Sequence, residues 1–366
     1  MDKPLILAYY LPQFHPIPEN DKWWGKGFTE WTNVGRARSL FKGHYQPRVP
    51  ADLGYYDLRI PQVREEQAEL AKAAGVSGFC YWHYWFNGKQ LMNEIIDEVV
   101  ATGKPNFPFC LGWANESWYK KAWDKETKKD TLIIEQTYGG EYDYRRHYEY
   151  CRNLFENRNY TRINGKPFFL IYKPNSFPDV PRFIELWNKW IVEDGIADGI
   201  YFVANTKDVN EDSLINIGFN AITPDPNARL LNILRNRNFI QLHLDDFNKK
   251  YRGIPFKIKM EDVNKYIFQI PSDVKENVIP VLFPQWDHSP RSGQFVFVIH
   301  NSIPEKFEEQ AISILSSIKR KNNKIVLLKS WNEWAEGNYI EPDLKYGHGY
   351  IDALHNALKK TATINF

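Results

Sequence analysis

The sequence predicts a single (β/α)8 TIM barrel with long insertions in its βα loops. Short apolar runs of strand length recur along the 366 residues and alternate with segments of helical periodicity. Eight strands alternating with helices over this length match a TIM barrel, and no glycine-rich strand-to-helix turn of a doubly wound nucleotide fold occurs. Polar and aromatic residues also follow strand after strand, at the end where a barrel builds its active site.

The individual elements can be located in chain order. The first apolar run ends with Leu5-Ile6-Leu7-Ala8-Tyr9-Tyr10, and the last is Ile325-Val326-Leu327-Leu328. The eight predicted strands are 4–10, 76–82, 107–113, 168–172, 200–205, 220–224, 278–283 and 325–330. Segments with helical periodicity between and after them predict helices at 60–74, 91–102, 144–156, 182–193, 304–319 and 348–360.

Two long insertions interrupt this alternation. Residues 11–56 separate the first strand from its helix, and residues 226–265 separate the sixth and seventh strands. Long loops on the functional face of a barrel shape a cleft. Within the second insertion, 230–237 and 256–268 are interpreted as short helices of a lid or an added subdomain.

Composition excludes several function classes. Net charge is +2, with 47 Lys and Arg against 45 Asp and Glu, so the chain has no overall basic excess for a nucleic acid or an acidic membrane surface. The three cysteines give no disulfide framework or metal-ligand spacing, and we expect neither metal nor cofactor. No leader pattern and no run of 18 apolar residues occurs, which predicts a cytoplasmic protein without membrane insertion.

The stretch 330–337, directly after the last predicted strand, is the most informative motif. It carries Glu333 and Glu336 three residues apart among tryptophans. Glycosidic bond cleavage needs a pair of carboxyl groups, and aromatic rings supply flat faces on which sugars stack. The alternative is that both glutamates are surface acids and that the tryptophans belong to the core. A 16% aromatic content is consistent with a ligand surface built from rings, although an aromatic-rich core explains many of them.

Further candidates come from the other strand ends and the first insertion. Glu30 and Trp31 lie in a ring-rich loop, where Glu30 is either a third carboxylate for sugar hydroxyls or an exposed loop acid. His83 is either a sugar ligand or a structural hydrogen bonder. Asp287 either contacts sugar or forms an ion pair with Arg291 that shapes the rim, which we favour. The remaining rim candidates are Tyr10, His15, Trp82, Trp85, Trp113, Asn115, Glu116 and Trp286.

These motifs together resemble a known family. The segments 9–15, 27–31, 113–118, 286–287 and 331–337, with Glu341-Pro342, resemble the WbsX-type proteins, which are similar to the endo-α-mannosidases of glycoside hydrolase family 99. The resemblance covers essentially the whole chain. It implies a TIM barrel that acts on a saccharide with α-linked, mannose-like sugars.

The resemblance also implies roles for the motif residues. Glu336 matches the general acid/base, and Glu333 matches the base that acts on the sugar 2-hydroxyl, so that a retaining reaction passes through a 1,2-anhydro sugar. This requires a neutral Glu336 and an ionised Glu333. Asn332 is then expected to hold a substrate hydroxyl or orient Glu333, with Trp331 and Trp334 walling the subsite.

Two other functions stay open at this point. WbsX-type proteins are labelled glycosyltransferases, although this chain has no Asp-x-Asp motif of a metal-dependent, nucleotide-sugar transferase. A non-catalytic carbohydrate-binding barrel is the second alternative, and the presence of both Glu333 and Glu336 argues against it.

Overall fold

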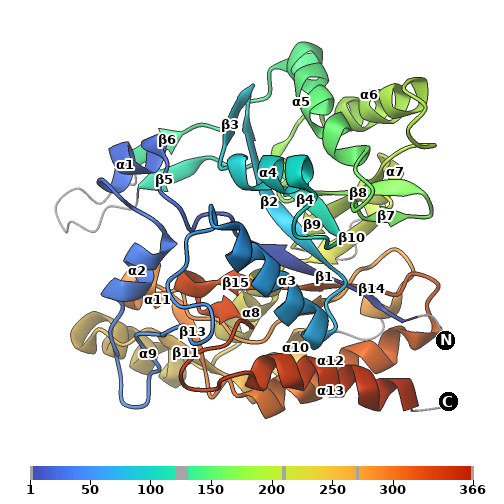
Figure 1. Cartoon of the computed structure of the whole chain (residues 1–366). Helices are drawn as coiled ribbons and strands as arrows, with labels where there is room; N and C mark the ends of the chain where they lie inside the picture. The colour runs from blue at the N-terminus through green and yellow to red at the C-terminus, as the bar shows by residue number, and fades with distance from the viewer. Residues whose placement is uncertain (1–2, 121–130, 208–211, 269–271, 364–366) are drawn as a thin grey trace.

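Eight parallel strands form a nearly closed barrel in the computed structural model, which describes residues 3–120, 131–207, 212–268 and 272–363 (Figure 1). The predicted TIM barrel is confirmed. Hydrogen-bonded neighbours follow the order β10, β9, β8, β4, β2, β1, β14, β12. In chain order the barrel strands are β1 (Leu5–Tyr10), β2 (Gly78–Phe86), β4 (Phe109–Trp113), β8 (Lys166–Ile171), β9 (Tyr201–Thr206), β10 (Ala221–Pro224), β12 (Val281–Leu282) and β14 (Ile325–Leu328).

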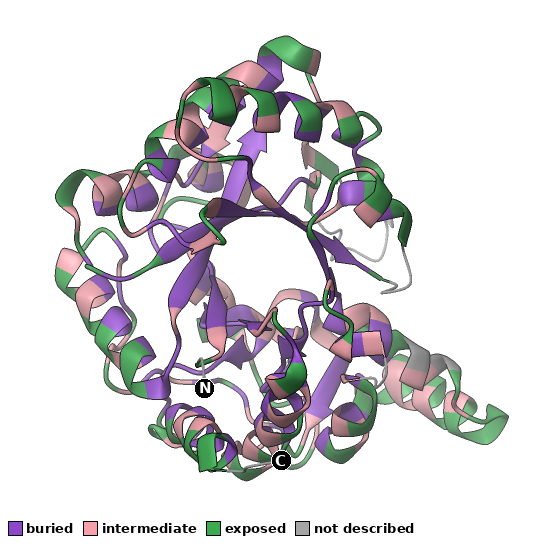
Figure 2. Ribbon diagram, turned by 90° about the vertical axis from the view of Figure 1, so that its right-hand side faces the viewer, coloured by how far each residue is buried: buried purple, intermediate pink, exposed green. Residues whose placement is uncertain are grey.

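The barrel closes between β10 and the segment that precedes β12. Ile222 N donates to Asn277 O and Ile279 N donates to Ile222 O, both at 2.8 Å. This is a parallel bridge between Ile222 and Val278, so the seventh strand is regular over only two of the six residues predicted for it. The barrel wall is almost entirely buried (Figure 2), because its apolar side chains face either the barrel interior or the surrounding helices.

The outer helices confirm each predicted helical segment to within a few residues. They are α3 (Pro61–Ala74), α4 (Glu94–Thr102), α5 (Gly140–Phe155), α6 (Val180–Glu193), α12 (Pro304–Ser317) and α13 (Gly349–Thr363), together with the short α7 (Asp212–Asn216). Each of the six long helices turns a buried stripe toward the sheet, as in α6, where Phe183, Ile184, Trp187 and Ile191 are buried. Among the described residues, no helix is both long enough and apolar enough to cross a membrane.

Three small hairpins extend the strands. β2 runs four residues beyond its predicted end and pairs with β3 (Lys89–Leu91), while β8 pairs with β7 (Arg162–Ile163). β5 (Trp118–Lys120) pairs with β6 (Thr131–Ile134). The longer β2 decides which of its aromatic residues face the cleft, because successive side chains of a strand point to opposite faces.

The first insertion lies over the carboxyl ends of the strands. It contains α1 (Pro18–Trp24) and α2 (Glu30–Arg36), and a capping box between Thr29 and Thr32 fixes the start of α2. The segment after β14 forms β15 (Asn332–Glu333), a single 3-10 turn (Trp334–Glu336) and β16 (Asn338–Tyr339). α2 packs against this turn, so the two ends of the chain meet at one site.

The second insertion differs from the predicted pair of short helices. It contains α8 (Pro226–Arg235), α9 (Phe239–Arg252), β11 (Phe256–Lys259) and α10 (Met260–Tyr266). The predicted helix at 256–268 begins as a strand because Phe256, Lys257 and Ile258 pair with β13 (Phe297–His300). α9, its longest element, was not predicted, and its apolar residues face solvent rather than a core.

Candidate active site

A cleft of about 610 Å³ opens at the carboxyl ends of the barrel strands. Its walls combine rings from the first insertion, from β2 and from the β5–β6 hairpin with polar residues that follow β12 and β14. The residues that form its polar centre and its nearest rings are Glu30, Trp82, Tyr84, Trp118, Tyr172, Trp286, His288, Arg291, Lys329, Glu333 and Glu336. A barrel is expected to bind its substrate at this end.

Glu333 and Glu336 lie together in this cleft. Their side chains are in hydrogen-bonding contact, and Trp82 Nε1 donates to Glu333 Oε1 at 2.7 Å. Asp287 N donates to the backbone oxygen of Glu336 at 2.7 Å and holds the turn in place. Gly337 ends the turn at φ 53°, and a Cβ there would lie 2.7 Å from Asp287 Cβ, so the turn requires glycine.

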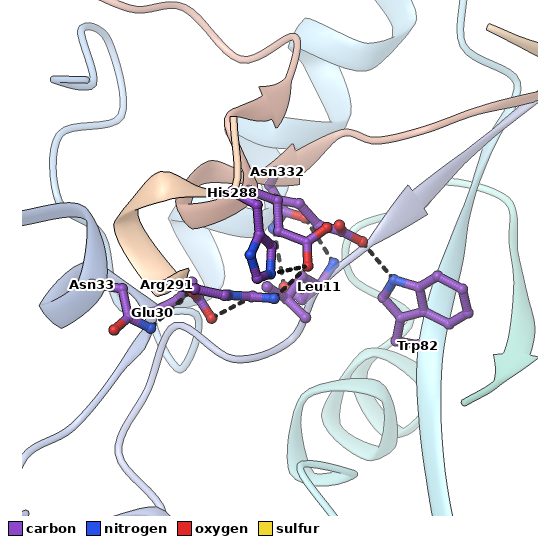
Figure 3. A network of polar contacts seen from close by, with 9 residues as sticks. Leu11, Glu30, Asn33, Trp82, His288, Arg291 and Asn332 are labelled. Carbon is purple, nitrogen blue, oxygen red and sulfur yellow. Dashed lines mark hydrogen bonds and ion pairs between the residues drawn. The ribbon is translucent and has the colours of Figure 1, made fainter. Parts of the chain in front are cut away.

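Arg291, from α11 (Ser289–Ser292), joins two carboxylates from opposite ends of the chain (Figure 3). Its Nε and NH2 groups donate to the two oxygens of Glu30 at 2.9 and 2.7 Å, and its NH1 group donates to Glu336 Oε1. His288 Nε2 lies 3.6 Å from the same oxygen of Glu336. The expected Asp287–Arg291 ion pair is therefore wrong, because Arg291 points toward the cleft and Asp287 away from it.

The surrounding charges separate the pKa values of the two catalytic candidates. Burial, followed by the charge of Glu336, raises the pKa of Glu333 well above the usual range for a glutamate. Burial also raises the pKa of Glu336, but the positive charges of Arg291, His288 and Lys329 outweigh it and hold that pKa well below the usual range. The groups around the pair therefore favour one proton on it, carried by Glu333.

This protonation is the reverse of the one that the family resemblance implies for catalysis. Lys329, which directly follows β14, helps to lower the pKa of Glu336. Its ammonium group lies 5.2 Å from the centre of the Trp286 ring. Burial lowers the pKa of Lys329, but Glu333, Glu336 and further carboxylates raise it overall, so that Lys329 stays charged. The site holds cations and carboxylates in close balance.

The cleft contains only part of the predicted substrate-binding set. Glu30, Trp82, Glu116 and Trp286 line it together with Glu333 and Glu336. Glu30 is also tied to Arg291, and Trp82 stacks on Tyr9 with ring centroids 4.6 Å apart, so both are held rigidly. Burial, followed by the opposing charge of Lys173, leaves the pKa of Glu116 raised.

Two candidates of the predicted rim on β2 point away from the cleft. His83 and Trp85 alternate with Trp82 and Tyr84 along a strand that extends to Phe86. Their side chains therefore face α5, where His83 Nε2 lies 2.8 Å from His147 Nε2 and Trp85 Nε1 donates to Asp143. The expectation that they bind sugar is corrected to a packing role.

Three candidates near the first insertion are also outside the cleft. Tyr10 is fully buried and donates to Gln67 Oε1 at 2.7 Å, so it joins β1 to α3. His15 is buried 3.8 Å from Glu94. Trp31 packs against Phe14 and Trp334 and donates to the backbone oxygen of Tyr56. Tyr10 and His15 were predicted from their position at the end of a strand and Trp31 from its ring-rich loop, and neither position defines the direction of a side chain.

Residues near the other strand ends support the cleft from behind. Asn115 accepts from Lys173 N and donates to Lys173 O, and Trp113 is in the core. Asp287 Oδ2 lies 2.7 Å from both His44 Nε2 and Gln46 Nε2. Burial would raise the pKa of Asp287, but the hydrogen bond from His44 and the charge of Arg48 hold it well below normal. The polar groups of Asn115 and Asp287 therefore bind other loops of the protein rather than facing the cleft.

In the stretch 330–337, Glu333 and Glu336 face the cleft, whereas Trp331, Asn332 and Trp334 contact other parts of the protein. Asn332 Oδ1 accepts from Leu11 N at 2.7 Å and its Nδ2 donates to Leu11 O at 3.1 Å. Trp331 is buried against Phe79, and Trp334 donates to Glu341 Oε2 at 2.6 Å. The three residues therefore support the segment that carries Glu333 and Glu336. The prediction that Trp331 and Trp334 wall the subsite is corrected, and of the two roles predicted for Asn332 these contacts fit the orientation of Glu333 rather than the binding of a substrate hydroxyl.

Sequence reasoning missed the cations and several rings of the cleft. Arg291 was paired with the wrong acid, and His288 and Lys329 were not recognised. Lys329 directly follows the last buried strand, which is a usable signal. Tyr84 and Trp118 were missed because strand and hairpin registers decide which rings face the cleft.

One group of possible metal ligands lies outside the cleft. His83, His147 and Cys151 have ligand atoms within 4.8 Å of one another and are buried between β2 and α5. Burial lowers the pKa of His83 to about 3 and holds that of His147 well below the usual value. A hydrogen bond between two neutral rings therefore accounts for the two facing nitrogens. A separation of 2.8 Å is shorter than two ligands of a tetrahedral zinc ion adopt, since each Zn–N bond is about 2.0–2.1 Å long.

The barrel with its cleft at the strand ends has a glycoside hydrolase-like fold. A solved structure described as "Glycoside hydrolase-like protein" matches with a TM-score of 0.60 and 14% identity over 98% of this chain and 94% of the other. The GH99 endo-α-mannosidase of Bacteroides thetaiotaomicron, solved with Bis-Tris propane, matches with a TM-score of 0.54 and 14% identity over 98% and 97%.

The chain belongs to the family described as "Glycosyltransferase WbsX", whose sequence model matches residues 6–354. The uncharacterized protein WxcX of Xanthomonas campestris pv. campestris, from two strains, is 34% identical over 98% of this chain and 50% of the relative. The chain thus spans about half the length of these curated relatives. The predicted family is confirmed.

The Asn332 contacts predict a large effect on stability. Asn332→Ala leaves the N–H and C=O groups of Leu11 without their partner, and a buried unpaired group costs about 1–3 kcal/mol. We expect the free energy of unfolding to fall by roughly 2–4 kcal/mol in denaturant titrations. Asn322→Ala, which changes an exposed asparagine, is the matched control. A loss below about 1 kcal/mol in Asn332→Ala would contradict the positioning role.

Proposed function

We propose that the protein is a glycoside hydrolase that cleaves α-linked, mannose-like oligo- or polysaccharides with retention. The observation that supports this most is the contact between Glu333 and Glu336 in an aromatic-lined cleft at the strand ends. Two carboxyl groups with separated pKa values are what general acid catalysis and charge stabilisation require. The glycoside hydrolase-like fold supports the same class.

The close contact of the pair supports retention. Inverting enzymes keep their two carboxyl groups about 6.5–9.5 Å apart to leave room for an attacking water, and retaining enzymes keep them closer. Carboxyl groups that share a hydrogen bond leave no such space between them. Attack through a 1,2-anhydro sugar, with Glu333 as base and Glu336 as general acid/base, is the retaining route that we propose.

The proposed route requires the proton of the pair to move when substrate binds. A sugar 2-hydroxyl that donates to Glu333 favours its ionised form and lowers its pKa. A glycosidic oxygen that displaces Arg291 from Glu336 removes a positive charge and raises the pKa of Glu336. The proton then passes from Glu333 to Glu336 across their existing contact. Glu30 retains Arg291 beside the site during this exchange.

The rings of the cleft supply the sugar-binding surface in this proposal. Trp82, Trp118 and Trp286 all line its wall. Stacking against them favours the apolar faces of a pyranose, while Glu116 and Lys329 offer hydrogen bonds to its hydroxyl groups. No metal is needed for this chemistry, since the acid and the base are both carboxyl groups.

Glycosyl transfer is a second candidate because the family is described as a glycosyltransferase. Surface-polysaccharide assembly is the setting in which that activity would operate. A transferase needs an activated sugar donor, whereas a hydrolase cleaves its substrate without one, so the two functions are separable by experiment. A carbohydrate-binding barrel without turnover is the third outcome.

Substituting the catalytic pair tests the hydrolase proposal. The parent protein, without any nucleotide sugar, is incubated with α-linked oligosaccharides and bacterial surface polysaccharides, and released sugars are measured by mass spectrometry. We expect Glu336→Gln and Glu333→Gln each to lose on the order of 10²–10⁴ in rate, because each removes a proton-transferring group. Glu94→Gln, at an exposed glutamate, is expected to retain full activity. Product that appears only with activated donors would establish transfer instead.

The roles of the two carboxyl groups predict different responses to the leaving group. The leaving group of an activated aryl glycoside departs as an aryloxide without protonation, so Glu336→Gln should cleave such a substrate much faster than it cleaves a sugar–sugar bond. Glu333→Gln should remain slow on both substrates, because the base on the 2-hydroxyl is needed in either case. If the aryl glycoside instead restores the rate of Glu333→Gln and not that of Glu336→Gln, the acid is Glu333. That result would agree with the proton that Glu333 carries in the absence of substrate and would contradict the proposed roles.

The pH dependence of kcat/KM reports the pair in the free enzyme. Activity requires one proton on the pair. It therefore falls at high pH, where Glu333 loses that proton, and at low pH, where Glu336 is protonated as well and the pair carries two. Because the pKa of Glu333 is raised and that of Glu336 is lowered, the active range should be broad and include neutral pH. Arg291→Gln should shift the acidic limb of this pH profile to higher pH by roughly 1–3 units, because it removes the charge that lowers the pKa of Glu336.

Arg36→Gln is the control for this shift, because Arg36 also lines the cleft but is not among the main causes of the lowered pKa of Glu336. Its acidic limb should stay in place. An acidic limb that does not move in Arg291→Gln would show that this guanidinium does not control Glu336.

A further inference from the structure

Helix α9 presents an apolar face to solvent. Phe239, Ile240, Leu244, Phe247 and Tyr251 are each between 50% and 71% exposed, and α9 has no buried residue. At about 100° per residue these five side chains fall within an arc of about 140° on one side of the helix. Apolar residues on a surface are common when scattered, but a continuous stripe of this kind marks a binding surface.

Cations lie directly beside this apolar face. The ammonium group of Lys250 is 5.1 Å from the centre of the Tyr251 ring, and the guanidinium of Arg252 is 5.8 Å from that of Phe247. Lys249 reaches the opposite side, 4.9 Å from the Phe256 ring. The acidic groups of the helix are Asp245, which pairs with Arg237, and the exposed Asp246.

The insertion that contains α9 is the basic part of the chain. Residues 226–265 contain nine lysines and arginines against four aspartates and glutamates, a net charge of +5, whereas the whole chain carries +2. One of the nine, Arg229, is buried with Asp273 and is not available to a partner. The small net charge of the whole chain predicted no binding to an acidic membrane surface, but the charge of this insertion is clearly positive.

From these observations we propose that α9 docks the protein on the surface of an anionic lipid bilayer. An amphipathic helix with aromatic and aliphatic residues on one face and lysine and arginine beside them lies in the plane of the membrane interface. Basic residues near the surface add an electrostatic attraction to anionic headgroups. The charge of the insertion is complementary to such headgroups, and this favours a bilayer over a neutral apolar partner.

The position of α9 suits this role. In Figure 1 it lies on the same side of the barrel as α2 and α11, which supply Glu30 and Arg291 to the cleft, and in Figure 2 it projects from the lower right of the barrel. A bilayer bound through α9 thus brings the cleft near saccharides that are attached to lipid. Docking does not require a membrane-spanning helix.

Vesicle sedimentation tests the proposal on the whole chain. Phosphatidylcholine vesicles with and without phosphatidylglycerol are mixed with the protein, and bound protein is measured after centrifugation. We expect binding to the anionic vesicles that weakens as salt rises. Leu244→Gln combined with Phe247→Gln should weaken binding by ~10-fold or more, because two apolar anchors are lost. Lys250→Ser combined with Arg252→Ser should weaken binding to anionic vesicles only.

The matched control changes two exposed apolar residues on α5 and α6, far from α9 in Figure 1. Tyr142→Gln combined with Val192→Gln should bind vesicles as the parent does. Circular dichroism and thermal unfolding of each variant verify that it is folded. Absent binding to anionic vesicles, or binding that the Leu244 and Phe247 changes leave intact, would overturn the proposal. So would concentration-dependent dimerisation that the same changes abolish, since α9 would then be a protein interface.

Discussion

The ion pair network of Arg291 is the interaction on which the site depends. One guanidinium holds both oxygens of Glu30 and one oxygen of Glu336, and these two acids are 306 residues apart in sequence. Such a bidentate contact fixes geometry as well as charge. Removing it would leave the two poorly solvated carboxylates of Glu30 and Glu336 without their shared cation, which is costly in a buried site. The same contact keeps Glu336 ionised, so it controls where the proton of the pair resides.

The barrel gives this network its rigidity through buried polar contacts behind the cleft. Asn332 ties the motif to the backbone of Leu11, and Glu341 accepts from Trp334, Tyr56 and Gln67. Burial raises the pKa of Glu341 to about 7, even though these donors lower it. These contacts join β15 and its turn to β1, the first insertion and α3. The carboxylate pair is thus held by both ends of the chain.

Most of the fold could be predicted from the sequence because a buried strand and an amphipathic helix leave strong local patterns. The eight barrel strands and six outer helices were located in this way. Helix α9 was not located although its apolar residues also follow a helical spacing, and the pattern alone does not tell that this face is left without a buried residue. At the site, Glu333 and Glu336 could be identified from spacing and surroundings, but His83 and Trp85 required the register of β2 to be known. The Arg291 contacts depend on tertiary proximity of α2 and α11, which no local pattern records.

Location of the shared proton tests the central claim most directly. Infrared difference spectroscopy of the empty protein at neutral pH, with deuterium exchange, resolves protonated carboxyl groups from carboxylates. The account predicts a protonated carboxyl signal with a component that is lost in Glu333→Gln, because the charges around Glu336 leave Glu333 as the protonated member of the pair. Glu341→Gln identifies the separate contribution of Glu341, whose pKa of about 7 leaves it partly protonated at neutral pH, and keeps the Glu333 component. A band that is unchanged in Glu333→Gln, or lost instead in Glu336→Gln alone, would contradict it.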